Sequence, residues 1–354
     1  MMPLVYEKIT NILIKLNNFA ASRGKLTGFC IGNTSKANEA GFYLTPMRET
    51  SRLVICGAIV FTDEWAKEFA EVVDGKVNYI LVDAEKKSLS VHLRRELSNV
   101  ERVVREAVRE SKIVTYKGND VTVDAIDSFV AQVLAVYPRG VSGKKAGIIG
   151  AGNLGSKLAL KLVERGMSVA LFRRDSAKLT TIVEAINIIK PAGTLATASA
   201  APDSLSAARG AHLLIGLTQG TAVITPQMVS ALASDGVLID GGKGCISANA
   251  IEQAFELKVP IYRANAQPAF WGQIETVMAT EQNLMIGMGR TTFDGVSVVS
   301  GGLMAVAGEI VVDSIHNPNT IFGIADGFGD FINTPTPSQI KMLNRVRNYI
   351  KARE

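Results

Sequence analysis

The sequence predicts an α/β protein, in which buried strands alternate with amphipathic helices along most of the chain. Short aliphatic runs are separated by segments whose apolar residues recur at helical spacing. Hydrophobic residues make up 47% of the chain and aromatic residues only 6%, which is typical of packed parallel strands. A length of 354 residues allows two domains of ordinary size.

The clearest pattern is a strand, a glycine turn, a helix and a second strand between Lys144 and Lys178. A buried strand is expected over 146–149, a helix to about Arg165, and a second strand over 168–172. The turn between the first strand and the helix has the spacing G-x-G-x-x-G, which allows a tight turn, close approach of a pyrophosphate, and close helix packing. We therefore expect a dinucleotide site formed by Gly150, Gly152, Asn153, Leu154 and Gly155.

Basic residues follow the second strand, where a site for NAD usually has an acidic residue. Arg173, Arg174 and Lys178 stand there instead, and guanidinium groups suit a 2′-phosphate because they donate two parallel hydrogen bonds. NADP is the cofactor that this cluster predicts. Asp175 either caps the next helix, which we favour, or binds a ribose in an NAD enzyme.

Alternation continues after Lys178 and predicts a doubly wound Rossmann domain over residues 139–290. Strands are expected at 212–217, 236–240 and 259–263, and helices at 178–188, 226–233 and 248–257. The loops 218–221 and 240–244 follow strands and are expected to face the cofactor. They contribute Thr218 and Gln219 to the cofactor site and Lys243 as a proton donor or an anchor for an anion.

Residues 1–138 predict a separate α/β domain that carries catalytic residues. Strands are expected at 26–31, 53–61, 77–82 and 113–116, and helices at 2–22, 63–73, 97–111 and 124–136. The breakers in 137–143 predict a connection between the two domains.

The last segment, 291–354, is expected to be helical and to pack back against the first domain. The sequence from Gly295 predicts a strand, a Gly-Gly turn and a helix of small residues. Thr336 to Gln339 forms a capping box with proline at the first helical position, and an amphipathic helix follows that would pack or form a dimer.

Hydride transfer to nicotinamide needs a partner for the accompanying proton. His92, His212 and His316 are poorly placed, whereas a lysine in a cleft has its pKa lowered and a carboxylate can orient it. We expect Lys87 and Asp124 to form a catalytic pair. The alternatives are a solvated lysine and an aspartate that only caps a helix.

These features resemble the superfamily of shikimate dehydrogenase, methylene-tetrahydrofolate dehydrogenase and the methylene-tetrahydromethanopterin dehydrogenases. The similarity lies in Arg174-Asp-Ser-Ala-Lys178, in the turn Ser300 to Met304, and in Thr122-Val-Asp124. It implies an N-terminal catalytic domain before the Rossmann domain, and a Lys and Asp dyad at Lys87 and Asp124. The Ser-x-Ser that holds shikimate is absent, so the resemblance does not extend to that substrate.

Composition argues against several other classes of protein. The formal charge of +5 is mild and interleaved with acidic residues, so nucleic-acid binding is not expected. Three cysteines at unrelated spacings predict neither disulfides nor a metal site. No run of 18 apolar residues occurs, so we expect a cytoplasmic protein that does not span a membrane, and a homodimer.

The predicted function is that of an NADP-dependent oxidoreductase acting on a carbonyl, imine or iminium carbon of a small, possibly anionic substrate. One alternative is a methylene-tetrahydropterin dehydrogenase, and another is an NADP-sensing protein without turnover. A loop after the last Rossmann strand would place Gln267, Trp271 and Gln273 on the substrate side.

Overall fold

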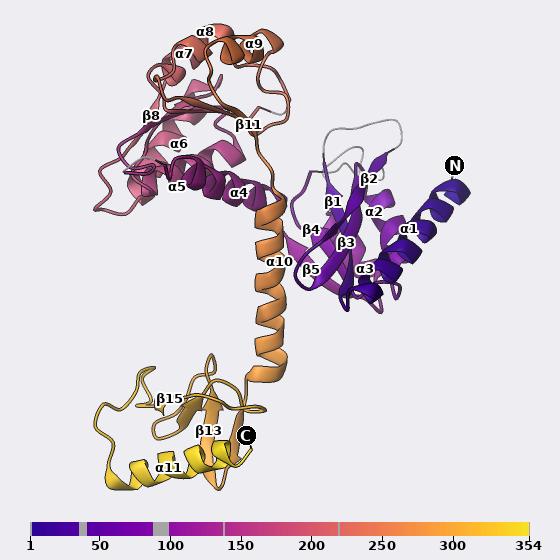
Figure 1. The fold of residues 1–354 in the computed structure, drawn as a ribbon, viewed down its shortest axis with the longest axis vertical. Coiled ribbons are helices and arrows are strands. Elements are labelled where there is room, and N and C mark those ends of the chain that lie inside the picture. The colour runs from indigo at the N-terminus through magenta and orange to yellow at the C-terminus, as the bar shows by residue number, and fades with distance from the viewer. Residues whose placement is uncertain (1, 35–40, 88–98, 137–138, 219, 354) are drawn as a thin grey trace. The chain divides into compact units, whose positions relative to one another are not determined.

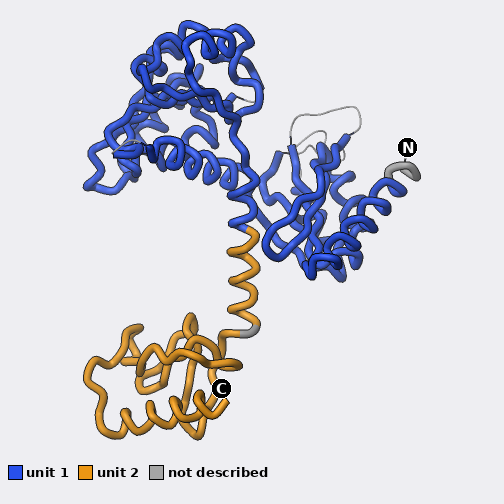
Figure 2. The backbone as a smooth tube through the Cα atoms, in the orientation of Figure 1, with its two compact units in different colours: residues 1–273 blue, residues 274–354 orange. Residues whose placement is uncertain are grey.

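The protein is described by a computed structural model that covers residues 1–354 apart from 1, 35–40, 88–98, 137–138, 219 and 354 (Figure 1). Contacts divide the chain into two compact units, residues 1–273 and residues 274–354 (Figure 2). The division falls inside one helix. The boundaries predicted at residues 138 and 290 remain predictions.

The first unit begins with a five-stranded sheet in the order β2-β3-β1-β4-β5. Four of its strands match predicted strands, and they run parallel: β1 (Leu26–Asn33), β3 (Leu53–Val60), β4 (Tyr79–Asp83) and β5 (Lys112–Tyr116). β2 (Phe42–Glu49) runs antiparallel at the edge and was not predicted. Its proline, Pro46, obscured the strand pattern, and an edge strand with a register shift between Thr45 and Arg48 tolerates one.

Three helices cover this sheet: α1 (Met2–Ser22), α2 (Asp63–Val73) and α3 (Val100–Ala107). Their buried side chains, such as Leu16, Phe69 and Val104, form one core with Phe29 and Val82 of the strands. The parallel order and this shared core confirm the predicted N-terminal α/β fold.

α4 (Gly118–Val133) follows β5 but packs into the core of the next sheet. Its Val123, Ile126 and Val130 are buried with Ile148 and Leu158. The helix begins six residues earlier than predicted, because Gly118 and Asn119 at its start are held by carboxylates from the end of β4. Asp124 is therefore inside the helix and does not open it.

The second sheet of this unit has six strands in the order β11-β10-β9-β6-β7-β8, all parallel. They are β6 (Lys145–Ile149), β7 (Ser168–Phe172), β8 (Ala198–Ala200), β9 (Leu213–Gly216), β10 (Val237–Asp240) and β11 (Ile261–Arg263). Its helices are α5 (Asn153–Glu164), α6 (Ser176–Ile189), α7 (Ser204–Ala208), α8 (Pro226–Ser230) and α9 (Ala248–Glu256). Separate cores on the two faces confirm a doubly wound fold. β8 and α7 were not predicted, because each is too short for its apolar residues to repeat at strand or helix spacing.

The loop expected around Gln267 is wrong, because residues 267–282 form the long helix α10 (Gln267–Gln282). Pro268 and Gly272 suggested a loop, but a proline in the first turn of a helix costs no hydrogen bond. A single π-helical turn, Asn283–Gly287, follows α10.

The second unit is a four-stranded sheet in the order β12-β13-β14-β15 with one helix, α11 (Pro337–Lys351). The strands are β12 (Arg290–Phe293), β13 (Val296–Ser300), β14 (Ile310–Val312) and β15 (Ile321–Ile324). The small-residue helix predicted after Ser300 is wrong: the β-branched residues Ile310, Val311 and Val312 form a strand instead. The capping box of α11 is confirmed at Thr336 and Gln339.

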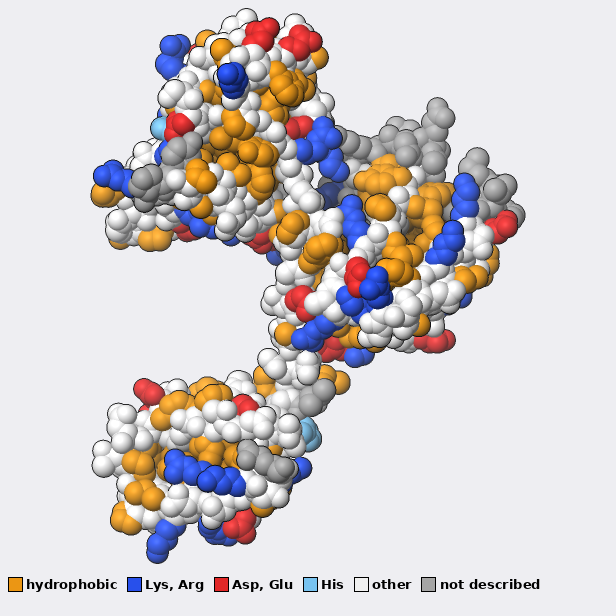
Figure 3. Space-filling view, in the orientation of Figure 1, with side chains coloured by type: hydrophobic (Ala, Val, Ile, Leu, Met, Phe, Trp, Pro, Cys, Tyr) orange, Lys and Arg blue, Asp and Glu red, His pale blue; other side chains and the backbone are white. Residues whose placement is uncertain are grey.

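Apolar side chains are exposed on this C-terminal unit (Figure 3). Met304, Phe322 and Phe328 are each more than half exposed. No helix in the described part of the chain is long and apolar enough to cross a membrane.

In the second unit an ion pair joins Arg290 of β12, which is 45% exposed, to the buried Glu309 just before β14. Glu309 is 4% exposed; its carboxylate accepts from Arg290 at 2.6 and 3.0 Å, from Ser297 Oγ at 2.8 Å, and from the Val306 N–H at 2.9 Å. Chiefly because of Arg290, the pKa of Glu309 falls from 4.5 to about 2. The stability that this carboxylate contributes is therefore present above about pH 4.5 and is lost as pH falls through about 2.

Glu309→Gln is expected to loosen this sheet at pH 7, because an amide nitrogen cannot accept from the donors that face the carboxylate. Exchange of the β13 and β14 amides, measured on the full chain by mass spectrometry, should be about tenfold faster than in the wild type. The difference should shrink between pH 5 and pH 2. Asp294→Asn, which breaks the exposed ion pair with Arg345, is the control and should exchange like the wild type. A difference in exchange rate between Glu309→Gln and the wild type that stayed the same at every pH would contradict the stabilising role of the Glu309 carboxylate.

Candidate functional site

The glycine turn between β6 and α5 has the conformation that a phosphate site requires. Gly150 has a φ of 110°, and a Cβ there would lie 2.7 Å from the Leu217 carbonyl oxygen. A Cβ on Gly155 would lie 2.2 Å from the Gly150 carbonyl oxygen, so the helix could not pack this closely with any other residue. A Cβ on Gly152 would meet nothing within 4 Å. Gly152 therefore borders open space at the helix start.

The first turn of α5 is available to an anion. Gly152 is the N-cap residue, no side chain caps the helix, and its first turn contains no acidic residue. Asn153, Leu154 and Gly155 follow, and the first N–H groups of a helix have no partner within it. The next helix differs, since the Asp175 carboxylate accepts from the Lys178 N–H at 3.1 Å. α5 thus presents free donors and a positive helix end where a pyrophosphate is expected.

The basic cluster lies directly after β7. Arg173 donates to the Ala151 carbonyl oxygen at 3.0 Å, which places its guanidinium beside the glycine turn. Arg174 is exposed, and the described residues give it no hydrogen bond or ion pair. Lys178 lies 3.6 Å from Asp175, whose pKa is lowered chiefly by the Lys178 N–H. Asp175 thus caps α6, as predicted.

The two predicted loops lie at the ends of β9 and β10. Thr218 donates to the Thr221 carbonyl oxygen at 2.7 Å and lies 3.2 Å from the Cys245 sulfur. Gln219 lies outside the described residues. Lys243 is exposed with a φ of 57° and has no polar partner among the described residues.

The loop that carries Lys243 is held by a buried carboxylate. Asp240 is 6% exposed and accepts from the backbone N–H groups of Gly244 at 2.7 Å and Cys245 at 3.2 Å. Burial alone would raise the pKa of Asp240, but these bonds hold it below its ordinary value. Asp240 is occupied with shaping the loop.

α4 and α5 run parallel, side by side (Figure 1), and three ion pairs join them. Aspartates spaced along α4 meet basic residues spaced along α5: Asp120 with Lys157, Asp124 with Lys161, and Asp127 with Arg165. The last pair is bidentate, at 2.5 and 2.8 Å. Parallel pairing brings the start of α4 to the same end as the start of α5, where the phosphate turn lies.

Lys87 lies at this end, in a cluster built from the end of β4 and the start of α4. Its ammonium is 3.0 Å from Asp83 Oδ2 and 2.5 Å from Glu85 Oε2. The same two carboxylates accept from the first N–H groups of α4, Asp83 from Gly118 at 3.2 Å and Glu85 from Asn119 at 2.8 Å. Lys87 is thus fixed to the helix start through two shared partners.

The surroundings keep Lys87 charged. Burial by itself lowers the pKa of this ammonium, but Asp83 and Glu85 raise it above its ordinary value. Burial raises the pKa of Asp83, although Lys87 and backbone N–H groups oppose the shift. The lowered pKa expected for a lysine in a cleft is therefore wrong, because two carboxylates outweigh burial, and the Lys87 side chain carries its proton at neutral pH.

The structure does not bring Lys87 and Asp124 together. Asp124 is 53% exposed and pairs with Lys161 at 3.0 Å, within the ladder between the helices. Lys87 finds its carboxylates four and two residues away in its own segment. The sequence signal that was missed is the acidic pair Asp83 and Glu85 at the end of a buried strand.

Asn33 is a further polar residue that the sequence did not single out for this edge. Its amide nitrogen donates to the carbonyl oxygens of Asp83 at 3.3 Å and Glu85 at 2.8 Å, which ties the end of β1 to the segment before Lys87. Nearby, Cys30 and Tyr116 share a hydrogen bond of 3.2 Å. Burial raises the pKa of Cys30 to about 12 and that of Tyr116 well above its usual value, so neither ionises at neutral pH.

The first turns of α10 lie against the N-terminal sheet. Arg48 of β2 donates to Gln267 at 2.7 Å, and the rings of Tyr116 and Phe270 meet edge to face at 4.8 Å. Trp271 and Gln273 are partly exposed one turn later. The substrate role predicted for them stays a prediction.

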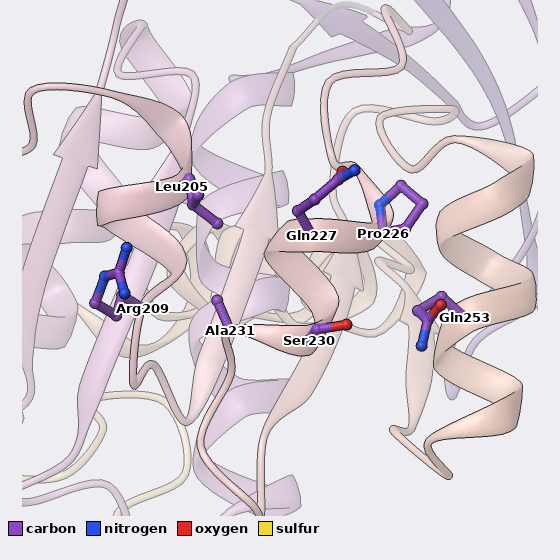
Figure 4. Close-up of a pocket in the computed structure, with 7 residues that line it drawn as sticks. All are labelled: Leu205, Arg209, Pro226, Gln227, Ser230, Ala231 and Gln253. Carbon is purple, nitrogen blue, oxygen red and sulfur yellow. The ribbon is translucent and has the colours of Figure 1, made fainter.

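A surface pocket of about 430 Å³ opens between α7, α8 and α9 (Figure 4). It is lined by Leu205, Arg209, Pro226, Gln227, Ser230, Ala231 and Gln253. No predicted cofactor or catalytic residue lines it. The described residues also contain no group of three or more His, Cys, Asp or Glu side chains that could hold a metal ion.

Comparison with known protein families finds a match in the Rossmann domain of this chain. Residues 145–258 match the family described as the NAD binding domain of 6-phosphogluconate dehydrogenase. No curated protein matches the chain in sequence.

Several solved structures have a similar arrangement of elements. Shikimate dehydrogenase in complex with NADP+ is 15% identical, with a TM-score of 0.41 over 73% of this chain and 91% of that one. L-tryptophan dehydrogenase from Nostoc punctiforme is 12% identical, with a TM-score of 0.41 over 71% and 72%. The 5-ketofructose reductase of a Gluconobacter species is 15% identical, with a TM-score of 0.38 over 72% and 92%.

The chain is therefore a protein with an N-terminal α/β domain followed by an NAD(P)-binding Rossmann domain. Its dinucleotide domain is of the kind found in dehydrogenases. The particular superfamily, the preference between NAD and NADP, and the substrate remain predictions.

Two glycines of the turn provide a matched pair of variants. Gly152→Ala should fold normally, since its φ of −92° suits alanine and its Cβ would meet open space, but NADPH affinity should fall at least tenfold. Gly155→Ala should lower the free energy of unfolding by about 1–3 kcal/mol. Denaturant unfolding and NADPH calorimetry separate the two effects. If Gly152→Ala bound NADPH with wild-type affinity, the glycine turn would not be part of the dinucleotide site.

The three ion pairs between α4 and α5 predict that substitutions along α4 lower the free energy of unfolding by unequal amounts. Asp127→Asn should destabilise by about 2 kcal/mol, because this carboxylate is 7% exposed and leaves Arg165 without its partner. Asp124→Asn should cost less than about 1 kcal/mol, since both partners are largely exposed. Urea unfolding of both variants checks the order, and a larger loss at Asp124 would contradict it.

Proposed function

We propose that this protein is an NADP-dependent oxidoreductase that transfers hydride between nicotinamide and a carbonyl, imine or iminium carbon of a small substrate. The observation that carries the proposal is the end of β7. Arg174 is exposed without a partner among the described residues, Arg173 is held at the glycine turn, and the acidic residue nearby is occupied as a helix cap. An acid committed to capping is poorly available to a ribose hydroxyl, whereas an unpaired guanidinium suits a 2′-phosphate.

NADP chemistry supplies the hydride, and the chain would supply the binding and the proton. Donors at the start of α5 would hold the pyrophosphate, and Arg173, Arg174 and Lys178 the 2′-phosphate. Lys87 is the residue that we assign to the proton. Lys87 carries its proton at neutral pH and lies at the same end as the phosphate turn, and both support a role as donor to the oxygen or nitrogen of the reduced bond.

Direct comparison of NADPH and NADH tests the cofactor. The wild type should bind NADPH at least tenfold more tightly, and Arg174→Ala should lose most of that preference while binding NADH as before. Arg347→Ala, which removes an exposed arginine of α11, is the control. Equal binding of both dinucleotides by the wild type would overturn the NADP assignment.

Replacement of Lys87 tests catalysis. In a screen of carbonyl and imine substrates with NADPH, Lys87→Met should lower kcat at least a hundredfold and leave NADPH affinity within about threefold. Asp124→Asn should keep most of the activity, because its partner is Lys161. Unchanged turnover in Lys87→Met would remove Lys87 from the mechanism. Binding without turnover on every substrate would favour an NADP sensor.

A further inference from the structure

Asn119 lies where the contacts of Lys87 and those of the phosphate turn meet. It is the second residue of α4, and its backbone N–H donates to Glu85 Oε2 at 2.8 Å. Its side-chain amide donates to Asn153 Oδ1 at 3.4 Å. Asn153 is the first residue of α5, in the turn assigned to the pyrophosphate.

One carboxylate oxygen joins Asn119 to Lys87. Glu85 Oε2 accepts from the Asn119 N–H and also lies 2.5 Å from the Lys87 ammonium. The start of α4 lies close to this cluster, because a Cβ on the neighbouring Gly118 would lie 2.9 Å from Asp83 Oδ2 and 3.0 Å from Lys87 Nζ. A shift of the α4 start would therefore move the partner that holds Lys87.

Asn153, at the other end of this chain of contacts, is exposed at the start of α5. The first turn of α5 has no side-chain cap, so a bound phosphate would be the group that orders it. The helices themselves are held in register by the ion pairs further along. At this end the described residues provide two direct polar links between the helices, the Asn119 to Asn153 amide contact and the Asp120 to Lys157 ion pair, and the first of them is the one that reaches the phosphate turn.

We propose that Asn119 is a positioning residue, which couples occupation of the phosphate turn to the placement of Lys87. The inference rests on the proposed dinucleotide binding. An occupied turn holds Asn153, Asn153 holds the Asn119 amide, and the Asn119 backbone holds Glu85 against Lys87. Lys87 then loses freedom when the cofactor's phosphates bind, before any substrate arrives.

The test needs no substrate. The probe is 2′-phospho-ADP-ribose, which carries the phosphates of NADP without the nicotinamide ring that would cover Lys87 directly. Brief labelling of the full chain with an amine-reactive reagent, read at Lys87 by mass spectrometry, should be at least threefold slower in the wild type with the probe bound. Asn119→Ala should bind the probe with a Kd within about threefold of the wild type, yet show no such slowing.

Asp120→Asn is the matched control, because it removes the adjacent ion pair with Lys157 and leaves the Asn119 amide in place. The wild-type slowing should persist in this variant. Equal slowing in Asn119→Ala and the wild type, or its absence from the wild type despite binding, would overturn the coupling alone. Loss of slowing in both variants would assign the effect to general loosening of α4 and would also overturn it. Failure of the wild type to bind the probe would overturn the dinucleotide assignment and the coupling with it.

Discussion

The packing of α4 against α5 is the constraint on which the candidate site depends. α4 follows the last strand of the first sheet, yet its apolar side chains are buried in the core of the second. Ion pairs at three levels hold the two helices parallel. Because parallel helices start at the same end, the start of α4, which Lys87 adjoins, and the start of α5, which follows the glycine turn, become neighbours.

The two helix starts illustrate opposite solutions to the same physical problem. Each begins with N–H groups that its own helix cannot satisfy. At α4 the protein supplies two carboxylates, Asp83 and Glu85, and these recruit Lys87. At α5 it supplies none, and an anion from outside is the natural partner. The difference separates a pre-formed polar cluster from a ligand site.

Lys87 also shows why a buried charge is rarely explained by one partner. Desolvation alone would favour the neutral amine, which would make a base. Two carboxylates reverse that preference and leave an ammonium, and both are themselves anchored by backbone donors. The expected partner, Asp124, has a side chain that is 53% exposed and pairs with Lys161 instead.

Sequence alone determined the parts of this protein that depend on local chemistry. The glycine spacing, the strand runs and the capping residues Asp175 and Thr336 act over a few residues, so their roles are visible without a fold. Tertiary structure decided what depends on distant partners. β14 replaced an expected helix because Ile310 and Val312 are buried between two strands and α11, and Asp124 met Lys161 because two helices pack in parallel. The packing partners of β14 and the ion-pair partner of Asp124 lie far away in the sequence. The spacing of residues within one strand or helix does not show them, so only the folded chain could reveal them.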